Sequence, residues 1–579
     1  MKQNQSNRKS VIQICIITLS ILGLMVCIAV LFPQVNQMIL NLIEQFIQRD
    51  LYWRHVWLQV LPLIAMNGIC FILFFDFCTL TNFGRTLVQQ VKQEIIDCLT
   101  AINYRSFLIP ILLLSVVYLL GMLTIMRANF LYLDDIWRSA SGLRQFYNWS
   151  RYVSEFTAIF VHADTNLTDI SPLPQLLAIL ILSVSSVLLV YVMGESKTVA
   201  IKLLASIPLG LSPFFLECLS YKFDAPYMAL SILASIIPFL FITRKKAFLV
   251  CSVVSLLIMY MTYQAASGIY PMIVIILCFQ DWNSRKKSNK EILSFMGVAA
   301  LAFCCAGLIF RFFLMMPPSE HGDYIVSTVH PLSHILSGTL VNIKEYAMNI
   351  NHDLGTIWKI CITFVLLFFI TKSMYKTAQK KLASFCISML VVVIAFVLSF
   401  GLYSLMERPM FQPRALYGFG VFIAIFCVYV VSDYKKIANV MVFSLNWCFL
   451  VFAFSYGNAL ADQARYGEFR IGILLHDLSS LYPDQSKEGI QIQLENSIDY
   501  TPSVKNISKH YPIIERLVPK RLGTDFYLDD FYFLLYNQYK TNGKNKLTDF
   551  NTLNLPVVVD SYYHTIKSDG SCVLVILKH

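Results

Sequence analysis

The feature that most constrains the fold of this chain is a succession of long apolar runs. A helix needs about 20 apolar residues to cross the hydrocarbon core of a bilayer. Such runs recur along the first 460 residues, and 57% of the 579 residues are hydrophobic. Only 14% are charged, whereas a soluble domain carries roughly 25%. The sequence therefore predicts a polytopic α-helical membrane protein.

By the same length rule we expect about 13 transmembrane helices. The candidate runs are residues 11–32, 57–79, 107–126, 173–193, 199–219, 225–243, 248–263, 267–280, 292–316, 356–371, 384–405, 415–431 and 438–458. Runs 248–263 and 267–280 are short, so a broken or re-entrant pair is an alternative there. The first run follows several basic residues but is too long for a signal peptide, so we interpret it as an uncleaved helix.

Basic residues in alternate loops predict the orientation of these helices. Lysine and arginine are enriched in cytoplasmic loops. With a cytoplasmic N-terminus, the basic groups at 244–246, 285–287 and 435–436 all fall on the inner side. Topology thus accounts for the net charge of +11 without a nucleic-acid partner. The loops 127–172 and 317–355 are then predicted to be extracytoplasmic.

The last part of the chain, residues 461–579, is far more polar than the rest. We expect a helix at 471–481, a strand at 490–494, a helix at 504–517, and a hairpin of 557–567 and 572–578 around Asp569-Gly570. The sequence thus predicts a membrane domain over 1–460, followed by a small α/β extracytoplasmic C-terminal domain over 461–579.

Ionisable residues in and beside the spans gather at the predicted outer face. They are Asp134, Asp135, Arg138, Glu217, Lys222, Asp224, Arg311, Glu407, Arg408 and Arg414. Charge is costly near lipid, so this asymmetry predicts one polar site at the outer leaflet. A purely structural role is the alternative for several of these residues. Glu217, Lys222 and Asp224 could form an ion-paired helix cap, and Arg408 and Arg414 could simply reach the interface by snorkelling.

Two neighbouring segments contribute further candidates. The stretch after Asp135 is rich in aromatic residues and predicts an interfacial helix, with Gly142 as a point of interruption. If that stretch is helical, Asp135 and Arg138 share a face. An aromatic-belt helix without substrate contact is the alternative. At the end of the seventh run, Gln264 after Tyr263 could bond a sugar hydroxyl or mark a polar kink.

The adjacent carboxylates Asp134 and Asp135 suggest chemistry at the bilayer surface. A carboxylate within hydrogen-bond reach can act as general base for an attacking hydroxyl. Arginine can stabilise the negative charge of a departing lipid phosphate. Adjacent side chains diverge, so one Asp could be the base while the other orients the acceptor or holds a divalent cation. The sequence does not decide between them.

No motif predicts a metal site or a disulfide framework. The 15 cysteines lie mostly in apolar runs and form no CxxC pair, so we interpret them as small buried hydrophobes. His330 and His334 have helical spacing, but surface positions in a loop are the simpler interpretation. No metal ligand is therefore assigned.

Three segments resemble the Gtr type II glucosyltransferases, membrane enzymes of the GT-C class. The first is Tyr132-Leu133-Asp134-Asp135-Ile136-Trp137-Arg138, followed by Gly142, Trp149 and Arg151. The second is Tyr221-Lys222-Phe223-Asp224-Ala225-Pro226-Tyr227-Met228-Ala229-Leu230, and the third is Tyr263-Gln264-Ala265. The Asp pair alone is common to many GT-C enzymes, so the second segment is the more specific signal. The similarity covers roughly residues 60–460.

This resemblance implies a bacterial transferase that uses a polyprenyl-phosphate sugar, typically undecaprenyl-phosphate glucose. The acceptor would be a cell-surface polysaccharide such as O-antigen, or its lipid-linked precursor. A flippase and a donor-lipid synthase are the implied partners. Asp134 and Asp135 would be the catalytic carboxylates. The expected substrate-binding residues are Arg138, Arg151, Tyr221, Lys222, Asp224, Tyr263, Gln264, Arg311, Arg408 and Arg414.

Other functions compete with this one. A polysaccharide polymerase is also polytopic with outward arginines, but does not need an early Asp pair at the membrane edge. A lipid-linked glycan transporter would place charges near the bilayer midplane. A scaffold leaves the clustered outer charges without a reason, and a protein oligosaccharyl transferase would need a WWD-type motif that we do not find in residues 461–579.

Overall fold

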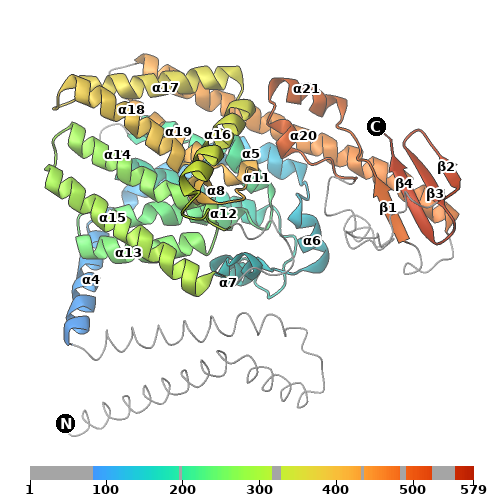
Figure 1. Ribbon diagram of the computed structural model, residues 1–579, viewed down its shortest axis with the longest axis horizontal. Coiled ribbons are helices and arrows are strands. Elements are labelled where there is room, and N and C mark those ends of the chain that lie inside the picture. Colours follow the sequence, from blue (N-terminus) through green and yellow to red (C-terminus); the bar gives the residue numbers. More distant parts are fainter. Residues whose placement is uncertain are drawn as a thin grey trace, which may run out of the picture.

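The computed structural model describes residues 82–194, 199–315, 328–431, 436–482, 491–523 and 554–578. In these ranges most of the chain is helical, and the helices lie side by side in one bundle from which α20 extends toward a small sheet (Figure 1). The predicted runs 11–32 and 57–79 lie outside the described residues. The polytopic helical architecture predicted from the sequence is thus found in the part that is described.

The helices up to residue 283 include many short pieces. They are α4 (Asn82–Thr100), α5 (Arg105–Ala128), α6 (Asp134–Ser141), η1 (Phe146–Trp149), α7 (Tyr152–His162), α8 (Leu173–Val192), α9 (Val199–Ala205), α10 (Pro208–Leu211), α11 (Pro213–Ser220), α12 (Ala225–Ile236), η2 (Ile237–Phe241), α13 (Lys245–Tyr260), η3 (Gln264–Gly268) and α14 (Ile269–Asn283). Proline at the start of α10, α11 and α12 suits a first turn, where its missing N–H has no partner to lose.

The second half holds longer helices. They are α15 (Asn289–Ile309), η4 (Phe310–Leu314), α16 (Ile335–Asp353), α17 (Thr356–Tyr375), α18 (Lys381–Leu398), η5 (Gly401–Leu405), η6 (Pro413–Ala415), α19 (Gly418–Val430), α20 (Lys436–Leu481), α21 (Pro502–His510) and α22 (Ile514–Leu517). Of these, η4 is a short π-helical turn that continues α15.

Seven helices of the described residues are long and apolar enough to cross a membrane. They are Arg105–Ala128, Leu173–Val192, Gln264–Asn283, Asn289–Leu314, Thr356–Tyr375, Lys381–Leu398 and Lys436–Leu481. The pair Ala200–Leu211 and Pro213–Ser220, bent by 59°, could form an eighth span. Ala225–Phe241 and Gly418–Val430 are apolar but shorter. The predicted total of 13 therefore stays a prediction.

Helix α5 packs against both α8 and α20. Gly457 of α20 lies against the backbone of α5, where a Cβ would come within 2.5 Å of the Thr124 carbonyl carbon. The Thr124 hydroxyl donates to the Ala453 carbonyl at 3.1 Å. A small residue at this crossing lets the two backbones approach, as is usual for helices packed in a membrane.

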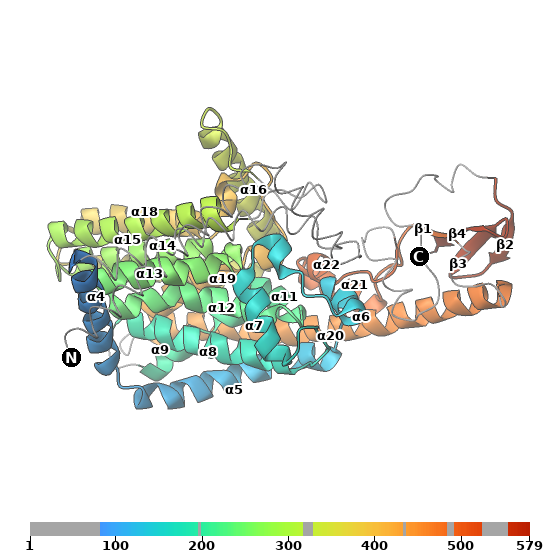
Figure 2. The same cartoon turned by 90° about the horizontal axis from the view of Figure 1, so that it is seen from below.

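Helix α20 is 46 residues long, about 69 Å at 1.5 Å per residue. That is more than twice the roughly 30 Å thickness of the hydrocarbon core. Its distal part leaves the bundle and runs beside the β-sheet (Figure 2). The predicted helix 471–481 is the end of α20, which passes without interruption through the boundary predicted at residue 460. The division into two domains stays a prediction.

The sheet has four strands in the order β1-β4-β3-β2. They are β1 (Gln491–Glu495), β2 (Val557–Asp560), β3 (His564–Ser568) and β4 (Cys572–Leu577), with β1 parallel to β4 and the other pairs antiparallel. The predicted turn at Asp569-Gly570 joins β3 to β4.

Two predicted elements differ from the structure. Run 557–567 is not one strand but two, because the Ser561 hydroxyl accepts from the Tyr563 and His564 N–H groups and closes a tight turn. Run 504–517 is also divided, into α21 and α22. Pro512 lies between them and has no N–H to continue the helical hydrogen bonding.

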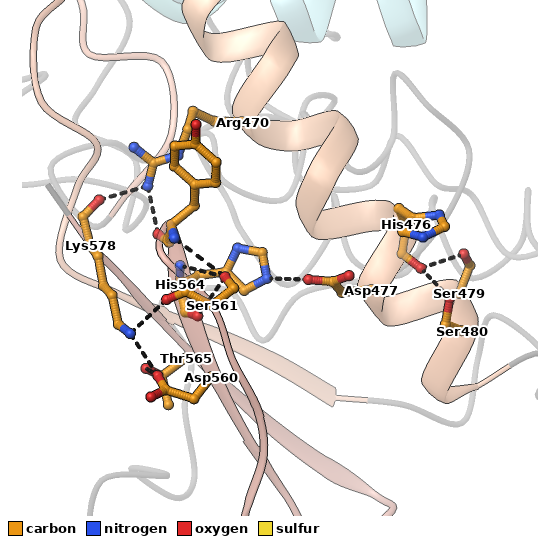
Figure 3. A network of polar contacts seen from close by, with 11 residues as sticks. Arg470, His476, Asp477, Ser479, Ser480, Asp560, Ser561, His564, Thr565 and Lys578 are labelled. Carbon is orange, nitrogen blue, oxygen red and sulfur yellow. Dashed lines mark hydrogen bonds and ion pairs between the residues drawn. The ribbon is translucent and has the colours of Figure 1, made fainter.

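A buried polar network fastens this sheet to α20 (Figure 3). Arg470 of α20 is 1% exposed and donates to the carbonyls of Tyr563 and Lys578 at 2.7 and 2.6 Å. His564 of β3 pairs with Asp477 through Nε2 at 2.9 Å. Apolar residues of α20, among them Leu474 and Leu478, pack in the same cluster as the buried face of the sheet.

Candidate functional site

A sharp turn between α5 and α6 places the two carboxylates at the start of a helix. Asn129 ends α5 in a left-handed conformation, with φ of 47°. Leu133, immediately before α6, has φ of 46°, a region in which a branched side chain is strained. Asp134 and Asp135 follow as the first two residues of α6. Carboxylates are favoured there because the free N–H groups and the helix dipole attract negative charge.

Asp135 is fully buried and holds the surrounding backbone together. Its carboxylate accepts the N–H of Tyr132 at 3.2 Å, of Lys222 at 3.0 Å and of Phe223 at 3.5 Å. It thereby ties the start of α6 to the turn between α11 and α12. Burial raises the pKa of this carboxyl, and the N–H of Lys222 opposes that shift. Its position is that of a structural acceptor.

Asp134, the adjacent residue, is exposed. Within the described residues its carboxylate makes no hydrogen bond or ion pair. The Asp134 carboxylate interacts electrostatically with Tyr221, Asp224 and Arg414. Asp134 therefore lies beside the polar cluster. The two carboxylates, equivalent in the sequence, therefore occupy opposite environments.

Arg138 and Asp224 form a buried ion pair between α6 and the start of α12. Arg138 Nη2 lies 3.3 Å from Asp224 Oδ1, and both side chains are 5% exposed. The guanidinium also lies 4.0 Å above the Phe146 ring and donates to the Arg144 carbonyl at 2.9 Å. Burial raises the pKa of Asp224, and the charge of Arg138 lowers it. The predicted common face of Asp135 and Arg138 is found, since both contact the 221–224 turn.

Lys222 and Glu217 do not pair with Asp224, as a simple helix cap would require. Lys222 Nζ instead lies 3.0 Å from Asp169 Oδ2, in the loop before α8. Glu217, 1% exposed in α11, binds Arg414 twice, through Nη1 at 3.0 Å and through the backbone N–H. Each partner comes from a distant part of the chain, so the ion-paired cap considered from the sequence is replaced by three long-range pairs.

Arg151 lies among aromatic rings at the same end of the bundle. Its guanidinium carbon is 4.5 Å from the centre of the Tyr263 ring and 5.6 Å from that of Trp149. Gln264 donates to the Trp149 carbonyl at 3.1 Å, which ties η3 to η1. Tyr263 stacks on Tyr417 and is buried. An arginine over aromatic faces keeps its charge while its N–H groups remain available for an anion.

Two predicted binding residues take no part in these pairs. Arg311 is exposed in η4, and its described contact is with the sulfur of Met315 at 3.6 Å. Arg408 is also exposed, on the segment between η5 and η6. The structure therefore does not bring Arg311 or Arg408 into the ion pairs that Arg138, Lys222 and Arg414 make.

Several buried polar atoms of this cluster lack a hydrogen-bond partner within the described residues. They are Arg138 Nε, Arg151 Nε and the hydroxyls of Tyr221 and Tyr227. Buried polar groups in native proteins are nearly always paired, so a concentration of unpaired ones needs a reason. A polar ligand that completes these bonds is such a reason.

A metal ion finds no ready-made site here. Among the residues that the structure describes, no group of three or more His, Cys, Asp or Glu side chains could hold one. His162 stacks on Phe223, and its Nδ1 accepts the N–H of Thr168 at 3.4 Å. Burial lowers the pKa of His162, so its neutral form is favoured.

Sequence reasoning missed the partners that complete the cluster. Asp169 carried no motif, and Tyr227 was quoted only as part of a resemblance. Arg516 and Leu517 come from the polar C-terminal stretch, where nothing signalled a role near the Asp pair. The Leu517 carbonyl accepts the Tyr132 hydroxyl at 2.8 Å, and the Arg516 guanidinium pairs with Asp353. Hydrophobic periodicity in a single sequence does not report contacts between such distant residues.

The comparisons with known proteins identify the family. The family model described as glucosyl transferase GtrII matches residues 123–453, which is more than half of the chain. This protein belongs to the GtrII glucosyl transferase family. The match begins in α5 and ends in α20, so it contains the Asp pair, the 221–224 turn and Arg414. Membership supports glycosyltransferase activity and confirms the resemblance drawn from the sequence.

A protein of Salmonella phage P22 is also similar, with 24% identity over 439 residues. The alignment covers 73% of this chain and 88% of that protein, which is described as an uncharacterized 55.3 kDa protein in the gtrB 5' region. No solved structure matches this GtrII chain.

Proposed function

We propose that this GtrII protein transfers glucose from a polyprenyl-phosphate donor to a polysaccharide, or to its lipid-linked precursor, at the extracytoplasmic leaflet. Family membership supports the glucosyl transfer. A polar cluster at one end of an apolar helical bundle supports reaction at a membrane surface, because a lipid-linked donor presents its phosphate and sugar there. The proposal includes the GT-C type of architecture and an O-antigen-like acceptor.

The observation that carries the mechanism is the contrast between exposed Asp134 and buried Asp135. We assign Asp134 as the general base, because an acceptor hydroxyl can reach it. The hydroxyl oxygen forms a bond to the anomeric carbon, the bond from that carbon to the phosphate oxygen breaks, and the hydroxyl proton passes to Asp134. Asp135 acts as a positioning residue, since its oxygens are engaged by backbone N–H groups.

The departing polyprenyl phosphate gains negative charge and needs cations. Arg414 and Arg151 are the residues proposed to bind it. Arg414 remains 19% exposed although it pairs with Glu217, and Arg151 carries an unpaired Nε. Fixed arginines aimed at developing charge are an effective source of catalysis. Arg138 and Lys222, both buried in ion pairs, are assigned to shaping the site.

The glucose unit is proposed to lie between these cations and the Asp pair. Tyr221 supplies an unpaired hydroxyl, which suits a ligand rich in hydroxyl groups, and Asp224 supplies a carboxylate that is already paired with Arg138. Tyr263 provides an aromatic wall beneath Arg151. Gln264 is proposed to hold η1 in place rather than to bind sugar directly. A flippase and a donor-lipid synthase are the proposed partner activities.

The test is transfer by membranes that contain the wild-type protein or Asp134→Asn, with polyprenyl-phosphate glucose and the surface polysaccharide of the host. We expect Asp134→Asn to lower transfer by about 10²–10⁴-fold, the range for loss of a general base, while the amount of membrane-inserted protein is unchanged. Asp164→Asn, an exposed carboxylate in the loop after α7, is the matched control.

The polysaccharide of cells with and without the protein separates the alternatives. A glucose side branch that depends on the protein supports the transferase. Shortened chains would favour a polymerase, and full activity of Asp134→Asn would refute the assignment of the base.

A further inference from the structure

A short C-terminal segment reaches back into the helical bundle beside the candidate site. Residues 513–518, here named the C-terminal brace, include α22. Four of them are buried in the main core, with at most 1% exposure: Ile513, Ile514, Leu517 and Val518. The family model ends at residue 453, so the brace lies beyond the matched region. Figure 2 shows α22 at the same end of the bundle as α6.

The brace meets the turn that carries the Asp pair through one carbonyl. The Leu517 carbonyl accepts the Tyr132 hydroxyl at 2.8 Å and the Tyr456 hydroxyl at 3.3 Å. The same Tyr132 hydroxyl lies 3.4 Å from Glu217 Oε1. Tyr132 also gives its N–H to Asp135. One residue therefore connects the brace to both acidic groups that organise the site.

Arg516 makes a second connection. One arm of its guanidinium pairs with Asp353, which is 0% exposed at the end of α16, and the other arm donates to the Phe411 carbonyl. Phe411 precedes Arg414 by three residues, and Arg414 is bound by Glu217 at its side chain and backbone. Arg414 is thus fixed from two directions, by α11 and by the brace.

We propose that the C-terminal brace is a positioning element of the reaction site, with Arg516 as the positioning residue that aligns Arg414. The proposal rests on the proposed function in one respect, since Arg414 is taken to hold the donor phosphate. The planar fork of arginine contacts Asp353 and the Phe411 carbonyl at once, whereas lysine offers a single point charge. A lysine at this position can therefore keep the ion pair with Asp353 while it loses the hydrogen bond to the Phe411 carbonyl.

The first test is Arg516→Lys in the full-length protein. The ammonium can still neutralise Asp353, which should preserve folding, but the link to Phe411 is lost. We expect the KM for polyprenyl-phosphate glucose to rise about tenfold, with kcat within about twofold, as for loss of one charge-assisted hydrogen bond to a binding group. Arg465→Lys is the control, because Arg465 is 80% exposed in the same region.

Hydrogen exchange supplies a readout that does not depend on catalysis. The amides of Arg414 and Ala415 donate to Glu217 and Gln412, so they should be protected in the wild type. We expect faster exchange over 411–415 in Arg516→Lys but not in Arg465→Lys. If the wild type transferred no glucose from this donor, the proposed function would be wrong. The exchange measurement would still test whether the C-terminal brace positions Arg414.

A second pair of variants covers the case in which Arg516→Lys does not fold. Tyr132→Phe and Tyr456→Phe each remove one hydroxyl from the Leu517 carbonyl, and Tyr456→Phe also removes a hydrogen bond with Ser220 at 2.8 Å. Only the Tyr132 hydroxyl also lies within 3.4 Å of Glu217, and the backbone N–H that Tyr132 gives to Asp135 is kept in Tyr132→Phe. We expect Tyr132→Phe to raise exchange over 411–415 and the donor KM, and Tyr456→Phe to change neither. Equal behaviour of the two variants, or unchanged exchange in Arg516→Lys, would overturn the proposal.

Discussion

Two buried polar regions of this protein are built from similar residues and differ in how completely they are paired. In the network between α20 and the sheet, Arg470 binds two carbonyls and the Tyr466 hydroxyl. Within the described residues, no buried side-chain atom of Arg470 or His564 lacks a partner. The cluster around Asp135 instead leaves Arg138 Nε, Arg151 Nε and the Tyr221 hydroxyl without a hydrogen-bond partner.

The difference separates a structural role from a binding role. A fully paired network rigidifies the fold, because every buried donor and acceptor has recovered the bond it lost from water. A partly paired one costs stability and is retained where a ligand completes it. Burial and charge are alike in the two regions, so the state of the hydrogen bonds is the informative observation.

The largest expected change in stability comes from breaking the fully paired network between α20 and the sheet. Arg470→Met should leave the Lys578 carbonyl without a donor and the Tyr563 carbonyl with only the Lys578 N–H, and destabilise the attachment of the sheet by about 3 kcal/mol. Proteolysis of the C-terminal region would measure it. Transfer by the intact fraction should persist, since Arg470 lies outside the cluster. Unchanged protease resistance would contradict the structural role.

A matched pair of tyrosines sharpens the contrast. Tyr466→Phe removes an acceptor of Arg470 and should cost about 1 kcal/mol of stability, with transfer unchanged. Tyr221→Phe removes a hydroxyl that has no partner within the described residues, so stability should stay within about 0.5 kcal/mol. Its transfer should fall about tenfold, as for loss of one hydrogen bond to the substrate.

Thermal unfolding and transfer kinetics, measured side by side on both variants, give the answer. If Tyr221→Phe lost stability and Tyr466→Phe lost activity, the structural role would belong to the cluster around Asp135 and the binding role to the network at Arg470.

The smallest expected effect is a pH dependence of the paired network. Burial lowers the pKa of His564, and the contact with Asp477 opposes that shift. The unfolded chain therefore binds a proton below about pH 6.5 that the folded sheet does not. Stability of the sheet should fall as the pH drops through that value.

Hydrogen exchange of β3 and β4, corrected for its intrinsic pH dependence, would measure this loss. His564→Gln should remove it. A sheet that became more stable on acidification would show that the Asp477 contact dominates instead.

The order of the apolar runs allowed much of the bundle to be predicted. The predicted runs within the described residues fall on helices, although run 199–219 is divided among α9, α10 and α11 and run 225–243 between α12 and η2. Burying a backbone in lipid demands helical hydrogen bonding. The candidate site was predicted in part. The Asp pair, the 221–224 turn, Arg138, Arg151 and Arg414 do converge, since charges avoid lipid and gather at one end. Arg311 and Arg408 satisfied the same rule, yet stand outside the ion pairs.

By itself, the sequence determined that the chain forms many apolar helices and that its charges gather in a few segments. It also determined the family, through motifs that are local. Only the tertiary structure decided that Asp135 is buried while Asp134 is exposed, and that Glu217 binds Arg414 rather than Lys222. Only the tertiary structure also decided that the Leu517 carbonyl contacts Tyr132, in the turn that carries the Asp pair. These outcomes depend on contacts between distant segments, and hydrophobic periodicity along one chain carries no record of them.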